Sequence, residues 1–108
     1  MIRAGALALL AAGPASASVE ESEAARCAAL WSGYAAYAEV SAYLDTGDAA
    51  AQAAKWRDLA AAETGDAAAV DAYIAREARE RASMLDAYIY SRDRQSREVF
   101  ERAMARCE

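Results

Sequence analysis

Strong helix-breaking signals occur at only two places after residue 17, and this feature limits the possible folds more than any other. They are Asp45-Thr46-Gly47-Asp48 and Glu63-Thr64-Gly65-Asp66. Each Gly suits the left-handed position that ends a helix, and each following Asp suits the N-cap of the next helix. Between these breaks the chain is rich in Ala, Leu, Glu, Arg and Gln, which are the best helix formers. We therefore expect an all-α fold.

Apolar residues recur at spacings of three and four along the chain, which predicts amphipathic helices. The first helix is expected from about Glu20 to Leu44, and the second from about Ala49 to Glu63. A third helix starts at Ala67, and its apolar stripe continues to Ile89. A further helical stripe covers Val99 to Cys107. No Gly or Pro separates the last two stripes, so the pattern alone allows either one long helix or two shorter ones.

The only two cysteines, Cys27 and Cys107, favour two shorter helices. An unbroken last helix would end ~60 Å from its start, whereas bridged Cα atoms lie within ~7 Å of each other. A disulfide therefore requires a turn near the polar residues 91–96. We predict a small up-down-up-down bundle of four helices, or of three with a kinked last helix, closed by this disulfide. Two free thiols, redox chemistry and a disulfide-linked dimer of long helices are the alternatives.

Alanine supplies 33 of the 108 residues. Because each Ala buries little area, the stability of the bundle is expected to come from its larger side chains. These are Leu30, Trp31, Tyr34, Tyr37, Leu44, Trp56, Leu59, Val70, Ile74, Leu85, Ile89 and Phe100.

Residues 1–17 have the layout of a secretory signal peptide. Met1-Ile2-Arg3 is positively charged, residues 4–12 are apolar, and Ala15-Ser16-Ala17 is a cleavage site of small residues. The apolar run is shorter than the ~20 residues of a membrane span, and we expect no span in the mature chain. We place a single helical domain at 18–108 in the bacterial periplasm or outside the cell. The alternative is an apolar N-terminal helix that stays in the fold.

The absence of His excludes several kinds of site. It removes a His-ligated haem, a Cys/His zinc site, a Ser-His-Asp triad and the Glu-x-x-His motif of bundle di-metal sites. We expect no metal, no cofactor and no catalytic residue. Without Arg3, 11 basic and 17 acidic residues give the mature chain a net charge of −6, which argues against nucleic-acid binding.

Several aromatic residues are candidates for contact with a ligand or partner. Trp31, Tyr34 and Trp56 are placed to line a small apolar pocket between helices, although core packing is the simpler interpretation. Tyr88 and Tyr90 lie on different faces of one helix, so at least one should be exposed. Exposed Tyr and Trp side chains are favourable anchors for a partner protein.

Three arginines, Arg92, Arg94 and Arg97, fall together at the expected turn. Such a group is suited to an acidic partner or a phosphate. The simpler interpretation is local pairing at spacings of four residues. The pairs would be Asp93/Arg97, Arg94/Glu98, Arg97/Glu101 and Glu98/Arg102.

These features favour an exported, non-enzymatic helical protein that acts as a protein–protein interaction module in the periplasm. An inhibitor, an immunity protein or an accessory subunit would be of this type, and its partner would be another envelope protein. A binder of small apolar ligands is the first alternative. An acid-responsive periplasmic chaperone is the second, because the 17 carboxylates become neutral as the pH falls toward ~4.

Overall fold

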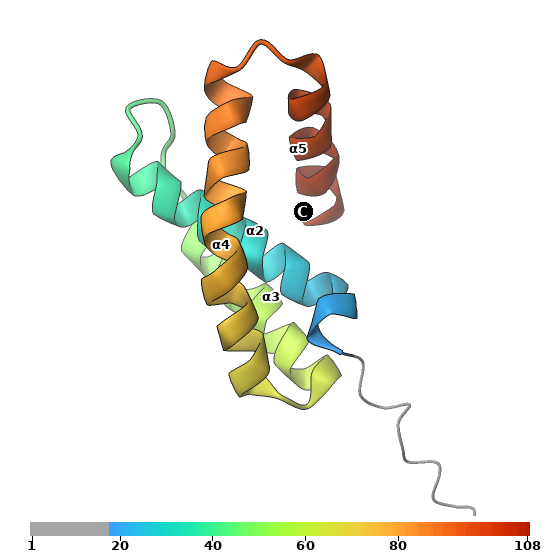
Figure 1. Cartoon of the computed structure of the whole chain (residues 1–108). Helices are drawn as coiled ribbons and strands as arrows, with labels where there is room; N and C mark the ends of the chain where they lie inside the picture. Colours follow the sequence, from blue (N-terminus) through green and yellow to red (C-terminus); the bar gives the residue numbers. More distant parts are fainter. Residues whose placement is uncertain (1–17) are drawn as a thin grey trace, which may run out of the picture.

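The computed structural model describes residues 18–108, and in that range it is entirely helical. The expected signal peptide, residues 1–17, lies outside the described part. A short 3₁₀ turn and four α-helices follow one another. They are η2 (Val19–Glu21), α2 (Glu23–Val40), α3 (Ala49–Thr64), α4 (Ala67–Tyr90) and α5 (Arg94–Arg106). Successive helices run up, down, up and down, which confirms the predicted four-helix bundle (Figure 1).

The first helix is shorter at both ends than the apolar pattern predicts. At its start, Ser22 is the N-cap, and its Oγ accepts a hydrogen bond from the backbone N–H of Ala25 at 3.1 Å. At its end, the helix stops at Val40 rather than near Leu44. The hydroxyl of Ser41 accepts hydrogen bonds from the N–H groups of Tyr43 and Leu44, at 2.9 and 3.3 Å. This local turn competes with the helical hydrogen bonds and ends the helix.

The break between α3 and α4 follows the predicted chemistry. Gly65 adopts the left-handed conformation with φ of 71°, and its N–H donates to the carbonyl of Ala61. The side chain of Asp66 accepts a hydrogen bond from the N–H of Ala69 at 3.0 Å and caps α4.

An ion pair joins α3 to α4 beyond this break. Arg57 on α3 donates two hydrogen bonds of 2.8 Å to the carboxylate of Asp71 on α4. This bidentate contact holds the pKa of Asp71 below its ordinary value.

The break between α4 and α5 lies at residues 91–93, inside the predicted turn. The hydroxyl of Ser91 accepts a hydrogen bond from the N–H of Asp93 at 2.9 Å. The Asp93 carboxylate then accepts from the N–H of Gln95 at 3.1 Å, as an N-cap of α5. Two short polar side chains thus make the turn without Gly or Pro.

The predicted disulfide joins Cys27 on α2 to Cys107 at the end of α5, with their Cα atoms 5.3 Å apart. Both residues are buried. The indole N–H of Trp31 donates a hydrogen bond of 2.8 Å to the carbonyl oxygen of Cys107. The last turn of α5 is therefore attached to α2 by a covalent bond and a hydrogen bond.

The core has two parts. The first is made mostly of alanines where α2, α3 and α4 meet, and consists of Ala24, Ala25, Ala29, Ala60, Val70 and Tyr73. The second surrounds the disulfide and consists of Cys27, Leu30, Leu85, Phe100 and Cys107. Trp56 packs against both parts. α5 packs against the second part, to which it contributes Phe100.

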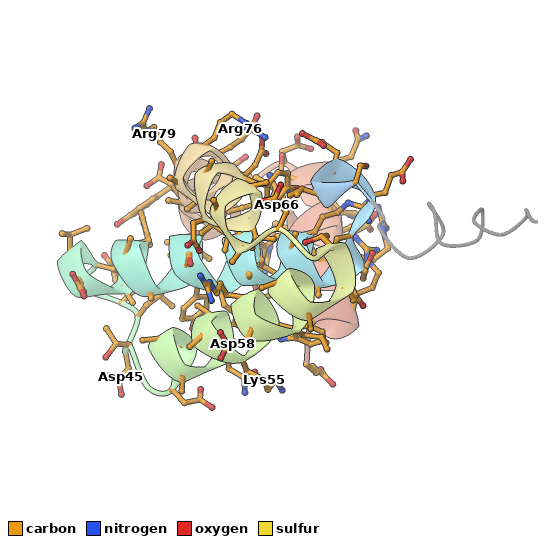
Figure 2. The ribbon with its side chains drawn as sticks, turned by 90° about the horizontal axis from the view of Figure 1, so that it is seen from below. Asp45, Lys55, Asp58, Asp66, Arg76 and Arg79 are labelled. Atoms are coloured by element: carbon orange, nitrogen blue, oxygen red, sulfur yellow. A yellow bond between two sulfur atoms is a disulfide. The ribbon has the colours of Figure 1, made fainter. Side chains whose placement is uncertain are left out.

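The burial of two large side chains differs from the prediction. Leu59, expected on the apolar face of the second helix, is 45% exposed, whereas Tyr73, not among the expected core residues, is only 6% exposed. The small Ala60 occupies the buried position next to Leu59. Figure 2 shows α3 beside α2, with Lys55 directed away from the rest of the molecule.

Gly33 allows α4 to pass very close to α2. A Cβ atom at this position would lie 2.6 Å from the carbonyl oxygen of Ala78 and 2.8 Å from Cβ of Arg81. Both distances are shorter than any van der Waals contact, and one of the two atoms is backbone. The position therefore requires Gly, although Gly within a helix costs about 1 kcal/mol relative to Ala.

We predict that Gly33→Ala destabilises the protein by about 1–3 kcal/mol, because the added methyl group separates α2 from α4. Helix propensity alone predicts the opposite sign. Urea unfolding followed by circular dichroism measures the change. Ala36→Gly, at an exposed position of the same helix, is the control and should cost about 1 kcal/mol. A Gly33→Ala variant as stable as the wild type would contradict the close approach.

We predict that the double substitution Cys27→Ala/Cys107→Ala lowers the free energy of unfolding by roughly 4 kcal/mol, because the disulfide closes a loop with a sequence separation of 80 residues. Urea unfolding of the oxidised wild type and of the variant measures the difference. Hydrogen exchange should become faster in α5 before it does so in α3. Equal loss of protection in all four helices would contradict the separate attachment of α5.

Candidate interaction surface

Three of the most exposed large apolar side chains lie where α2 and α4 end. Val40, Tyr43 and Tyr90 are 81%, 70% and 60% exposed. The rings of Tyr43 and Tyr90 form an edge-to-face pair with centroids 6.0 Å apart. Tyr43 reaches this position because the Ser41 turn directs the chain away from the helix. The sequence indicates Tyr90 as a candidate contact and places Tyr43 off the main apolar stripe, but it does not indicate Val40, which lies within the helix expected to continue to Leu44.

A hydrogen bond between α2 and α4 lies beside this aromatic pair. The hydroxyl of Tyr37 donates to the carboxylate of Asp86 with an O–O distance of 2.7 Å. This hydrogen bond raises the pKa of Tyr37 to about 12, with smaller contributions from partial burial, from the Asp86 charge and from Tyr90. The contact fixes the C-terminal half of α2 relative to α4 and so supports the exposed tyrosines.

The three predicted arginines come together at the start of α5. Arg92, Arg94 and Arg97 line one surface hollow of about 410 Å³, together with Glu98 and Glu101. None of the ion pairs found among residues 18–108 involves any of the three arginines. No carboxylate of the described chain therefore occupies their guanidinium groups.

The expected local pairing of these arginines is wrong. None of the four predicted pairs brings its charged atoms within 4.0 Å in the described residues. Asp93 is used differently, since its carboxylate accepts hydrogen bonds from the Gln95 N–H and the Ser96 hydroxyl. Arg97 instead places its guanidinium carbon 5.6 Å from the ring centroid of Tyr88. Capping and cation–π contact thus replace the helical ion pairs.

Tyr88 and Tyr90 have different environments, as their places on the helix predict. Tyr90 is exposed, whereas Tyr88 is half-buried and packs on Phe100 with ring centroids 4.9 Å apart. The Tyr88 hydroxyl donates a hydrogen bond of 3.4 Å to Glu101. Tyr88 therefore joins α4 to α5, and Tyr90 faces the solvent.

The predicted trio of Trp31, Tyr34 and Trp56 packs against the core part that surrounds the disulfide. Trp31 and Tyr34 have ring centroids 5.5 Å apart. The indole N–H of Trp31 donates to the Cys107 carbonyl oxygen. The buried indole N–H of Trp56 has no hydrogen-bond partner in the described chain. Of the three, Tyr34 borders a groove of about 370 Å³, which continues along α5.

We name the surface formed by Val40, Tyr43, Tyr90, Arg92, Arg94 and Arg97 the tyrosine–arginine end. Tyr43 packs on Tyr90 at the end of α4, and the three arginines follow in the α4–α5 turn and the first turn of α5. The α4–α5 turn lies at the top of Figure 1. Within residues 18–108, no three acidic or Cys side chains gather in the way that a metal ion requires. None of the described helices is both long enough and apolar enough to cross a membrane.

No family model matches the sequence, and comparisons with curated proteins and with solved structures also return no match.

We predict a pH-dependent loss of stability caused by the Tyr37–Asp86 hydrogen bond. The hydroxyl must be protonated to donate, so the contact stabilises the fold fully below pH 10 and is lost as the pH rises through about 12. Absorbance at 295 nm follows the tyrosine titration, and Tyr37→Phe identifies the group. Asp86→Asn should move the pKa of Tyr37 back toward its ordinary value of 10.0. An unchanged titration curve in Asp86→Asn would contradict the assignment.

Proposed function

We propose that this chain is an exported, non-enzymatic interaction module that binds another protein of the bacterial envelope through the tyrosine–arginine end. The observation that carries the proposal is a set of three arginines without ion pairs that closely follows the exposed Tyr90 in the chain. Tyr43 packs edge-to-face on Tyr90. The signal-peptide layout of residues 1–17 supports export. The disulfide also supports it, because disulfides form and persist mainly in oxidising compartments outside the cytoplasm.

The residue types at this end are suited to binding. Tyr and Arg are enriched among the few interface residues that supply most of the binding energy. Because the arginines form no ion pairs within the described chain, a partner would not have to break such contacts first. Arginine stays protonated at all ordinary pH values, so it binds anions well and is a poor proton acceptor. These properties favour recognition over acid–base catalysis.

The charges of the surface indicate the chemistry of the partner. The chain is acidic overall, yet the segment 92–97 carries three arginines and one Asp, which is engaged as a helix cap. A partner with carboxylates placed beside an apolar patch would match both the arginines and the tyrosine pair. The partner class is therefore a protein with an acidic, partly apolar surface.

Hydrogen bonds near this surface reduce the conformational entropy that would be lost on binding. Asp93 caps α5 and fixes the turn that carries the arginines, and the Tyr37–Asp86 hydrogen bond fixes the base of Tyr90. Side chains on rigid elements lose less conformational entropy when a partner binds than side chains on mobile loops. The backbone that carries Tyr90 and the arginines is thus held in place before a partner binds.

The proposal is tested by affinity capture from the periplasm of the producing cell with the oxidised chain 18–108. We expect one protein to be retained by the wild type and lost with Tyr43→Ala/Tyr90→Ala and with Arg92→Gln/Arg94→Gln/Arg97→Gln. Each set should weaken binding by about 2 kcal/mol or more, which is the usual effect at an energetic centre of an interface. Affinity should also fall steeply with added salt.

Matched controls distinguish this surface from general stickiness. Leu59→Ala removes an exposed apolar side chain from α3, and Arg79→Gln removes an exposed arginine of α4 that also forms no ion pair (Figure 2). Both variants should capture the partner as the wild type does. A partner retained equally by the wild type and by both tyrosine–arginine variants would overturn the proposal.

A further inference from the structure

A groove that adjoins the arginine hollow lies between α5 and the rest of the bundle. It has a volume of about 370 Å³. Its walls come from α2, the loop after α2, α4 and α5, and the apolar lining residues are Tyr34, Leu44, Leu85, Tyr88, Phe100 and Met104. This size is within the range of sites for small molecules.

The charged groups on the groove are both carboxylates. Glu101 and Glu108 contribute to its lining, both are exposed, and neither takes part in an ion pair of the described chain. Glu101 accepts only a long hydrogen bond of 3.4 Å from the Tyr88 hydroxyl. Glu101 also lines the neighbouring hollow, together with Arg92, Arg94 and Arg97. Arg97 lies over the Tyr88 ring, but none of the three arginines lines the groove itself. A ligand in this groove would therefore contact apolar side chains along its length and the carboxylates of Glu101 and Glu108 at the edge.

The groove is held open by contacts that the rest of the fold supplies. The Ser41 hydroxyl fixes the loop that presents Leu44, with an N–O distance of 3.3 Å. The disulfide and the Trp31 hydrogen bond fix the last turn of α5, next to Met104 and Glu108. Neither wall depends on a ligand for its position, so the groove is largely preformed.

We propose that this groove binds a small organic cation with an apolar body, of the alkylammonium class. The apolar chain would lie on Leu44, Leu85 and Met104, and the ammonium group would face Glu101 and Glu108. A carboxylate-bearing ligand of the same length would meet like charge at the rim, and a neutral one would gain no charge contact. This inference goes beyond the proposed protein partner and uses other residues.

Isothermal titration of the oxidised chain 18–108 with octylammonium, octanol and octanoate tests the inference. We expect octylammonium to bind most tightly and octanoate at least about tenfold more weakly, because the charged residues that line the groove are both carboxylates. The double variant Glu101→Gln/Glu108→Gln should weaken octylammonium binding by about tenfold, as expected for two partly exposed charge contacts. Octylammonium should also slow hydrogen exchange in α5 of the wild type.

A variant with the same change in net charge serves as the control. Glu39→Gln/Glu80→Gln removes two exposed carboxylates outside the groove and should leave octylammonium affinity unchanged. Tyr43→Ala/Tyr90→Ala should also leave it unchanged, which separates this inference from the proposed protein partner. No binding of octylammonium, equal binding of octanoate, or equal loss in the two charge variants would overturn it.

Discussion

The structure depends most on the bond between Cys27 and Cys107. It joins residues separated by 80 positions and brings the end of α5 against the first half of α2, next to the hydrogen bond from Trp31 to the Cys107 carbonyl. The second core part, the apolar groove and the arginine hollow all include residues of α5. Because a domain of this size buries a limited core, such a cross-link supplies a large share of its stability. Both proposed sites therefore depend on the oxidised chain.

Alanine determines how the other helices meet. The first core part is formed mainly by alanines, and Gly33 lets the backbone of α4 approach α2 more closely than any larger residue would. Small side chains at such crossings allow tight helix packing but bury little apolar area each. The larger apolar residues are thus concentrated around the disulfide, and others, such as Tyr43 and Tyr90, remain outside the core. Those outside residues are the ones available for binding.

Short polar side chains decide where the helices end and which charged groups stay free. Ser41 ends α2 before its apolar pattern ends, yet the turn still returns Leu44 to the core part around the disulfide. Asp93 is used as a helix cap, and it therefore does not pair with Arg97. In each case a local hydrogen bond to the backbone replaces the interaction that residue spacing predicts. The loop wall of the groove follows from the first replacement, and the absence of an Asp93–Arg97 ion pair accompanies the second.

The sequence alone determined the helical class and the break at Gly65, because these features follow from local backbone preferences. It predicted the disulfide and, from the disulfide, a turn near Ser91, but it left free thiols and one unbroken last helix as alternatives. Only the tertiary structure decided that α2 ends at Val40, that Leu59 faces the solvent, and that Tyr37 donates to Asp86. It alone brought Leu44, Tyr88 and Met104 to one groove. The physical reason is that burial and side-chain pairing depend on which faces of different helices meet, and residue spacing within one helix does not contain that information.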